Sequence, residues 1–209
     1  MALILQNVRK ERETEKGNGM FTRRTFLTAS AAFGATAATS AMAQDAYVDP
    51  QFMPQVVSIQ SGFEPNTIHV DPNAFALYLI LGNDEAIRYS VGVARQGLYE
   101  DGVFTVGNKR EWPSWTPTPG MISREPEIYA KYAGGMPGGP DNPLGSRALY
   151  LYDANGRDTY LRIHGTPDPV TIGTSVSNGC VRLMNDHVAD LYDRVAMGTP
   201  VYLYPREMA

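Results

Sequence analysis

The residues best suited to chemistry in this 209-residue chain lie between Leu161 and Arg182, a stretch that holds its only cysteine, Cys180. His164 stands sixteen positions before that cysteine. A free thiol has a pKa of about 8.5 and is mostly protonated at neutral pH, so a nucleophilic cysteine needs an adjacent base or positive charge. The spacing therefore indicates a cysteine nucleophile with a histidine as its base.

A short turn, Ser177-Asn178-Gly179, comes directly before the thiol. Gly179 lets the backbone adopt positive φ or approach a substrate closely, as a turn that points N–H groups at an oxyanion requires. The turn is therefore a candidate oxyanion hole. Arg182, two positions after the thiol, is a permanent cation that could bind a substrate carboxylate or orient a neighbouring carbonyl.

The alternative for Cys180 is a small buried hydrophobic side chain, since free cysteines are often buried. The motif around it favours the nucleophile. Disulfides form in oxidising compartments, but a single cysteine excludes one within this chain.

Together these residues resemble the signature of the L,D-transpeptidase (YkuD-like) catalytic domain. The resemblance spans roughly Ile68 to Tyr204 and is carried by separated motifs in matching order and spacing. They are His164-Gly165, Ile172-Gly173, the run from Ser177 to Arg182, the segment from Asn142 to Leu151, and Gly198 to Val201. Many members place a second histidine where this chain has Asn178, which leaves His164 as the only candidate base nearby.

The resemblance implies a mainly β fold, a single β-sandwich catalytic domain over residues 68–209. It also implies an exported cell-wall enzyme, a cysteine-dependent acyltransferase that acts on peptidoglycan stem peptides. The thiolate would attack the bond between the third stem residue, a diamino acid, and the terminal D-Ala. D-Ala would leave, and an amine of a neighbouring stem would then attack the thioester to form a 3→3 cross-link.

The resemblance also assigns roles to residues. The nucleophile is Cys180, the general base and acid is His164, and the oxyanion hole and its support comprise Asn178, Gly179, Ser177, Arg182 and Gly165. Two alternatives share the same thioester: an L,D-carboxypeptidase that uses water, and a ligase that attaches another protein to peptidoglycan. An alternative of another class is a non-catalytic stem-peptide-binding module. A papain-like peptidase fits less well, because the histidine precedes the cysteine.

The first 43 residues read as an export segment. Residues 1–19 are polar without periodicity, and Met20, a possible true start, opens a segment with twin arginines at 23–24. An Ala- and Thr-rich run then ends in Ala41-Met42-Ala43, which predicts cleavage after Ala43 and residence in the periplasm or cell envelope. The run is too short and too weakly apolar to span a membrane comfortably, so we expect no stable membrane span after cleavage.

Composition bounds the remainder. An apolar fraction of 43% and a charged fraction of 19% are those of an ordinary globular protein. Removing residues 1–43 leaves 12 basic and 19 acidic side chains, a formal charge of −7, which argues against nucleic acid as a partner. No cluster of histidines, cysteines or acids has ligand spacing, so we expect no metal and no cofactor. Nothing in the sequence indicates an oligomeric state.

The elements that must position the site are mostly strands. After a lead-in segment (44–67) with one short strand, β-type runs cover 68–70, 75–81, 86–94, 103–107, 148–152, 158–164 and 201–204. A Gly-Asn-Asp turn predicts a hairpin between the second and third runs. In the run 158–164, alternation puts Leu161 and Ile163 on one face and His164 on the other, at an accessible strand end. We expect His69 to be structural.

Two further segments complete the chain. Residues 111–143 hold seven of the fifteen prolines and five glycines, which predicts a long loop with one short helix over 123–132. Its aromatic residues fit either a flap over the substrate cleft or simple packing on the sheet. An amphipathic helix begins with Asn185 as its cap, carries a solvated His187 in its first turn and ends at Gly198.

Overall fold

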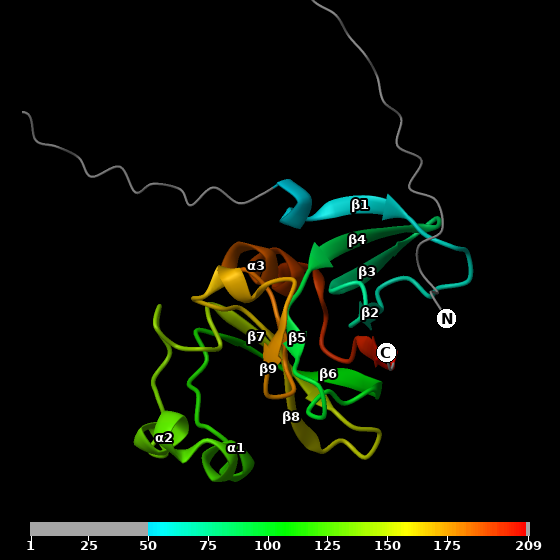
Figure 1. The fold of residues 1–209 in the computed structure, drawn as a ribbon. Coiled ribbons are helices and arrows are strands. Elements are labelled where there is room, and N and C mark those ends of the chain that lie inside the picture. The colour runs from blue at the N-terminus through cyan, green and yellow to red at the C-terminus, as the bar shows by residue number, and fades with distance from the viewer. Residues whose placement is uncertain (1–49, 208–209) are drawn as a thin grey trace, which may run out of the picture. The chain divides into compact units, whose positions relative to one another are not determined.

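The computed structural model describes residues 50–207, and Figure 1 shows the mainly β fold that the sequence predicts. The strands are β1 (Gln55–Ser58), β2 (Ile68–Asp71), β3 (Ala76–Gly82), β4 (Glu85–Ser90), β5 (Val93–Ala94), β6 (Gly102–Glu111), β7 (Arg147–Tyr152), β8 (Asp158–His164), β9 (Ser175–Ser177), β10 (Val181–Arg182) and β11 (Pro200–Leu203). The helices are α1 (Pro119–Arg124), α2 (Pro126–Tyr129) and α3 (Asn185–Arg194), with 3-10 turns η1 (Pro50–Phe52), η2 (Ala130–Tyr132) and η3 (Pro169–Thr171). The predicted twin-arginine signal, the predicted cleavage after Ala43 and the possible start at Met20 lie outside the described residues.

Nine strands form one sheet in the order β1-β4-β3-β2-β11-β6-β7-β8-β10. Strand β11 joins its two halves, because it pairs parallel with β2 and antiparallel with β6. The short strands β5 and β9 form a separate parallel pair. Sequence reasoning missed β9 and β10, since strands of three and two residues have no periodicity to detect. The turn before Cys180 lies between these two strands.

Both halves of the sheet bury side chains in one core. Its members include Leu77 and Tyr89 from β3 and β4, Leu149 and Ile163 from β7 and β8, and Leu191 from α3. Because strands from both halves bury side chains against one another, the sheet must curve around the core, in agreement with the predicted sandwich. Helix α3 packs on β7 and β8, the strands that lead to His164 (Figure 1).

The predicted hairpin is confirmed. Strands β3 and β4 are antiparallel, and the two residues between them, Asn83 and Asp84, have φ of 53° and 59°. Positive φ at both positions is the geometry of a type I′ turn, which matches the twist of the flanking strands. The run predicted over 86–94 is interrupted, since β4 ends at Ser90 and β5 begins at Val93.

His69 has the structural role that the sequence predicts, although it is only 5% exposed. Its ring stacks on Tyr202 with centroids 4.6 Å apart, and its two nitrogens lie 2.9 Å from Thr67 Oγ1 and 2.8 Å from Tyr204 OH. Burial lowers the pKa of His69 to about 4, so the imidazole is neutral at physiological pH.

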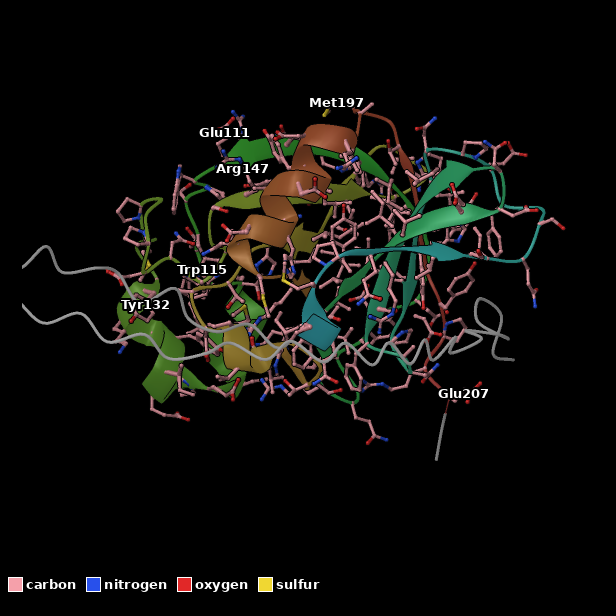
Figure 2. All side chains as sticks on the ribbon, turned by 90° about the horizontal axis from the view of Figure 1, so that it is seen from above. Glu111, Trp115, Tyr132, Arg147, Met197 and Glu207 are labelled. Atoms are coloured by element: carbon pink, nitrogen blue, oxygen red, sulfur yellow. The ribbon has the colours of Figure 1, made fainter. Side chains whose placement is uncertain are left out.

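The excursion between β6 and β7, residues 112–143, is here called the flap. Its helical part begins earlier than predicted, at Pro119, because Thr118 Oγ1 accepts a hydrogen bond of 3.2 Å from Met121 N and proline is favoured in the first turn. The helix breaks before Pro126, which has no N–H to donate. Figure 2 labels Trp115 and Tyr132 on the flap, where their ring centroids lie 5.7 Å apart.

The base of the flap is held by β6 and β7. Glu111, the last residue of β6, forms an ion pair of 3.1 Å with Arg147, the first residue of β7 (Figure 2). The two residues also face each other in the antiparallel register. The flap therefore leaves and re-enters the sheet at adjacent positions.

Helix α3 differs from its predicted form at both ends. Asn185 is its first residue rather than its cap, because Asn185 Oδ1 accepts a hydrogen bond of 2.9 Å from Ser146 N. The helix ends at Arg194, before Gly198. Lys109 Nζ donates to the carbonyl oxygens of Tyr192, in the last turn, and of Val195, the C-cap residue. The prediction that His187 is solvated is wrong, since it is 5% exposed. With ten residues α3 is the longest helix of the described chain, in which no helix is long and apolar enough to cross a membrane.

Candidate active site

The thiol and the imidazole belong to two adjacent chain segments, since Cys180 comes directly before β10 and His164 ends β8. Strand β10 runs parallel to β8, with Val181 opposite Ile163 and Arg182 opposite His164. One residue earlier in the same register, Cys180 lies beside Arg162, and its Sγ is 3.8 Å from the carbonyl oxygen of Tyr160. Since alternate residues of a strand share a face, the register places Cys180 on the same face as His164, in a diagonal position.

The hydrogen bond of His164 fixes its tautomer. Its Nδ1 lies 2.6 Å from the carbonyl oxygen of Gly165. A carbonyl oxygen only accepts, so Nδ1 carries the proton and Nε2 keeps a free lone pair. The expected accessible position is wrong: His164 is 3% exposed, because the adjoining strand and α3 enclose the end of β8.

Burial and charge keep both groups neutral at rest. The pKa of His164 is lowered from 6.5 to about 3, first by burial and then by the positive charge of Arg182. Burial also raises the pKa of the Cys180 thiol, although the N–H and the charge of Arg162 act in the opposite direction. At neutral pH the site therefore holds a thiol and a neutral imidazole with a lone pair available for the proton.

Ser177 holds the turn in shape. Its buried hydroxyl donates to the carbonyl oxygen of Cys180 at 2.5 Å and accepts from Gly179 N at 3.3 Å. The loop is thus tied to itself on both sides of Asn178.

Two glycines are required by geometry. Gly179 has φ of 135°, a conformation that side chains with Cβ rarely adopt. A Cβ on Gly165 would lie 2.3 Å from Asn185 Oδ1, so only glycine lets β8 pass this close to the start of α3. The positive φ predicted for Gly179 is confirmed.

The two arginines near the thiol differ in how their charge is balanced. Arg162 forms a bidentate pair with Asp158 at 2.7 and 2.9 Å and lies 4.0 Å from the centroid of Tyr150. Arg182 forms no ion pair within residues 50–207, and its buried Nε has no hydrogen-bond partner there. Burial lowers the pKa of Arg182, while its electrostatic interaction with Cys180 raises it. The charge of Arg162 is therefore balanced by Asp158, whereas that of Arg182 has no carboxylate partner among the described residues.

A pocket of about 110 Å³ opens beside the thiol. The sheet provides one wall, which includes Cys180, Arg162 and Tyr160, and the flap provides the other, which includes Trp115 and Thr118. Since flap residues line the same space as the thiol, the flap covers the candidate site. Of the two roles considered for its aromatic residues, that of a flap over the cleft fits this arrangement.

Sequence reasoning missed the polar groups that surround Asn178. They are Arg95, Arg124, Glu125 and Tyr129. Arg95, Arg124 and Tyr129 contact Asn178 directly, and Glu125 is linked to it through Arg95. All four lie 49 to 83 positions away in the sequence, so no local spacing reveals them. Arg162 did carry a local signal, because it precedes His164 by two positions on the same face of β8.

Comparison with known proteins shows which family this chain resembles in sequence. The model of the L,D-transpeptidase catalytic domain family matches residues 65–203. The chain is similar to the probable L,D-transpeptidase ErfK/SrfK of Escherichia coli, with 38% identity over 57% of this chain and 36% of that protein. It is also similar to the probable L,D-transpeptidase YbiS of the same species, with 34% identity over 66% of this chain and 45% of that protein. The chain thus spans less than half the length of these curated relatives.

A solved structure is also similar. It is the probable carnitine operon oxidoreductase caia from Brucella melitensis, 50% identical, with 77% of this chain and 96% of that chain covered and a TM-score of 0.51. That name belongs to another class of activity. The present chain is assigned to its family by the family model, which matches residues 65–203.

Proposed function

The chain belongs to the L,D-transpeptidase catalytic domain family, and we propose that it catalyses acyl transfer on peptidoglycan stem peptides through a Cys180 thioester. The observation that carries the proposal is the diagonal placement of Cys180 and His164 on adjacent chain segments, with Cys180 in a pocket that the flap also lines and Nε2 of the imidazole unprotonated. A neutral thiol beside a neutral imidazole is equipped for general-base catalysis of thiol attack.

In the proposed acylation, Cys180 Sγ attacks the carbonyl carbon of the bond between the diamino acid and the terminal D-Ala. The thiol proton passes to Nε2 of His164, which then gives it to the leaving amine as the C–N bond breaks. D-Ala departs and a thioester remains. An amine of a second stem attacks the thioester, loses a proton to His164 and forms the 3→3 cross-link, and the regenerated thiolate takes that proton back.

We place the oxyanion at the backbone N–H groups of the turn. Asn178 and Cys180 contribute N–H groups directly. The N–H of Gly179 already donates to Ser177 Oγ, so it serves only if it exchanges that acceptor. Removing one oxyanion donor typically lowers kcat by ~10²–10³.

For Arg182 we propose that its guanidinium binds the carboxylate of the stem peptide. Its Nε is buried without a partner among the described residues, and its charge lacks an ion pair there. A carboxylate at this position would compensate both. Gly165 supports catalysis indirectly, since its carbonyl oxygen holds the tautomer of His164.

The test is intact mass of the purified chain after incubation with a disaccharide-tetrapeptide, followed by chromatography of the products. Transpeptidation predicts a Cys180-dependent acyl adduct, release of D-Ala and a cross-linked dimer. The adduct is absent from the Cys180→Ala variant, and His164→Gln forms it far more slowly. A folded protein that forms no adduct and releases no D-Ala refutes the proposed donor.

The products also identify the acceptor. Tripeptide without dimer means that water is the acceptor, so the protein would be an L,D-carboxypeptidase. Attachment of the stem peptide to an added envelope protein, with release of D-Ala, would identify a protein-to-peptidoglycan ligase. A folded chain whose Cys180 reacts with no thiol reagent would favour the non-catalytic binding module.

We further propose that residues 1–43 export the chain to the periplasm or cell envelope. Support comes from the twin arginines at 23–24 and the small residues Ala41 and Ala43 in the sequence. N-terminal sequencing of the protein from the producing cell is expected to begin at Gln44. Replacement of both arginines by lysine is expected to retain the precursor inside the cell, and normal processing of that variant would refute the twin-arginine assignment.

A further inference from the structure

The side chain of Asn178 connects the turn before the nucleophile to the flap. Its Oδ1 accepts hydrogen bonds from Arg95 Nη2 at 2.8 Å and from Arg124 Nη2 at 3.2 Å, and its Nδ2 donates to Tyr129 OH at 2.8 Å. Arg124 ends α1 and Tyr129 ends α2. Two of the three partners therefore belong to the helical part of the flap.

The third partner, Arg95, joins the same two regions. Its backbone N donates to the carbonyl oxygen of Ser177 at 3.1 Å, which fixes it to the strand before the turn. Its guanidinium forms two hydrogen bonds with Glu125, which lies between α1 and α2. Arg95 thus reaches the flap directly through Glu125 and also contacts Asn178.

These contacts lie one residue from Gly179 and two from the thiol. The opposite wall of the thiol pocket is built from the flap, through Ser114, Trp115, Thr116 and Thr118. A movement of the flap that breaks the Asn178 contacts therefore removes the hydrogen bonds between the flap and the turn and opens the pocket in one step. The same side-chain hydrogen bonds of Asn178 therefore hold both the turn and the flap that covers the pocket.

We propose that Asn178 is a positioning residue that fastens the flap to the nucleophile turn, so that closure of the pocket and alignment of the turn occur together. The side chain, rather than the backbone N–H, carries this role. An amide is suited to it, because one group accepts from two guanidinium groups and donates to a phenol oxygen. The effect on acylation rests on the proposed function, whereas the effect on access to the thiol does not.

The test is a double-mutant cycle of Asn178→Leu and Tyr129→Phe. Asn178→Leu keeps the backbone N–H and approximate size while removing the amide, and Tyr129→Phe removes a single hydroxyl from a half-buried ring. Tyr132→Phe is the matched control, since it removes a hydroxyl from the same flap without touching Asn178. Thermal unfolding of each variant shows whether it is folded.

Two rates are measured for every variant: acylation by the disaccharide-tetrapeptide and alkylation of Cys180 by iodoacetamide. Loss of one hydrogen bond corresponds to about a 3- to 10-fold change. We expect Tyr129→Phe to acylate about 3- to 10-fold more slowly and to be alkylated faster by a similar factor. Asn178→Leu loses three hydrogen bonds, so its effects should be larger. The double variant should resemble Asn178→Leu, because the contact with Tyr129 is already lost in that variant.

Other results overturn the proposal. Effects that multiply in the double variant would mean that Asn178 and Tyr129 act separately. A folded Asn178→Leu variant with unchanged alkylation, or a Tyr132→Phe control with the same effect as Tyr129→Phe, would exclude a specific fastening. If the wild type forms no adduct, the proposed function fails, and the alkylation cycle alone still decides whether Asn178 couples the flap to the turn.

Discussion

Ser177→Ala is the sharpest single test of how the turn supports catalysis. The Ser177 side chain is 1% exposed and makes two hydrogen bonds, to Cys180 O and from Gly179 N. A buried neutral hydrogen bond contributes about 1 kcal/mol, so losing both lowers the free energy of unfolding by about 2 kcal/mol. The methyl group of alanine neither donates nor accepts hydrogen bonds, so the turn loses both bonds that hold its shape.

The same loss should slow acylation by the disaccharide-tetrapeptide. Removing an oxyanion donor lowers the rate by ~10²–10³. A loosened turn keeps its N–H donors but positions them less well, so we expect the acylation rate to fall by a smaller factor, about 10- to 100-fold. The assay is single-turnover adduct formation followed by intact mass, with thermal unfolding measured in parallel. Ser175→Ala is the matched control, because it lies on the same strand and loses one hydrogen bond, from Arg206, outside the turn. Equal rates for the two variants would refute the reasoning.

Four other predictions follow from the charges and backbone of the site. Because the pKa of the Cys180 thiol is raised, its alkylation by iodoacetamide should increase with pH through neutrality without a plateau below pH ~9, and a plateau from acid pH would instead reveal a preformed ion pair. Arg182→Gln removes a positive charge that lowers the pKa of His164, so NMR titration should show that pKa rising, and no rise would contradict the assignment. Gly179→Ala forces alanine to φ of 135° and should cost about 1–3 kcal/mol in unfolding free energy, measured by denaturant titration. The pKa of His69 is about 4 in the folded state and 6.5 in the unfolded state, so between these pH values the unfolded state binds more protons. This group should therefore lower the free energy of unfolding by about 1.4 kcal/mol for each pH unit of acidification in that range. His69→Phe should reduce this pH dependence, measured by denaturant titration at several pH values.

Local patterns predicted the parts of the fold that local chemistry determines. The Gly-Asn-Asp turn specified the β3–β4 hairpin, because Asn and Asp tolerate the positive φ of a type I′ turn. Alternation in β8 placed Leu161 and Ile163 in the core. Long strands with one buried face can be predicted because apolar and polar side chains alternate along them with a period of two residues.

The parts that were missed depend on contacts distant in sequence. Asn185 has the right type for a helix cap, yet its side chain binds Ser146 N, 39 positions away. His164 follows the polar positions of its strand, but the packing of α3 buries it. The polar contacts of Asn178 join segments 49 to 83 positions apart. Residue type was informative at each of these positions, whereas the partner was set by the tertiary fold.

The distribution of charge acts in opposite directions on the two proton transfers of the proposed acylation. Arg182 carries a positive charge without an ion pair in the described chain, and it lowers the pKa of His164. An imidazolium beside this charge is unstable, so a proton taken from Cys180 is readily passed on to the leaving amine. The same charge stabilises negative charge that develops on sulfur and on the carbonyl oxygen, in surroundings where burial strengthens electrostatic interactions. The guanidinium would thus favour transfer of the proton to the leaving amine, whereas the lowered pKa of His164 makes the imidazole a weaker base when it takes the proton from the Cys180 thiol.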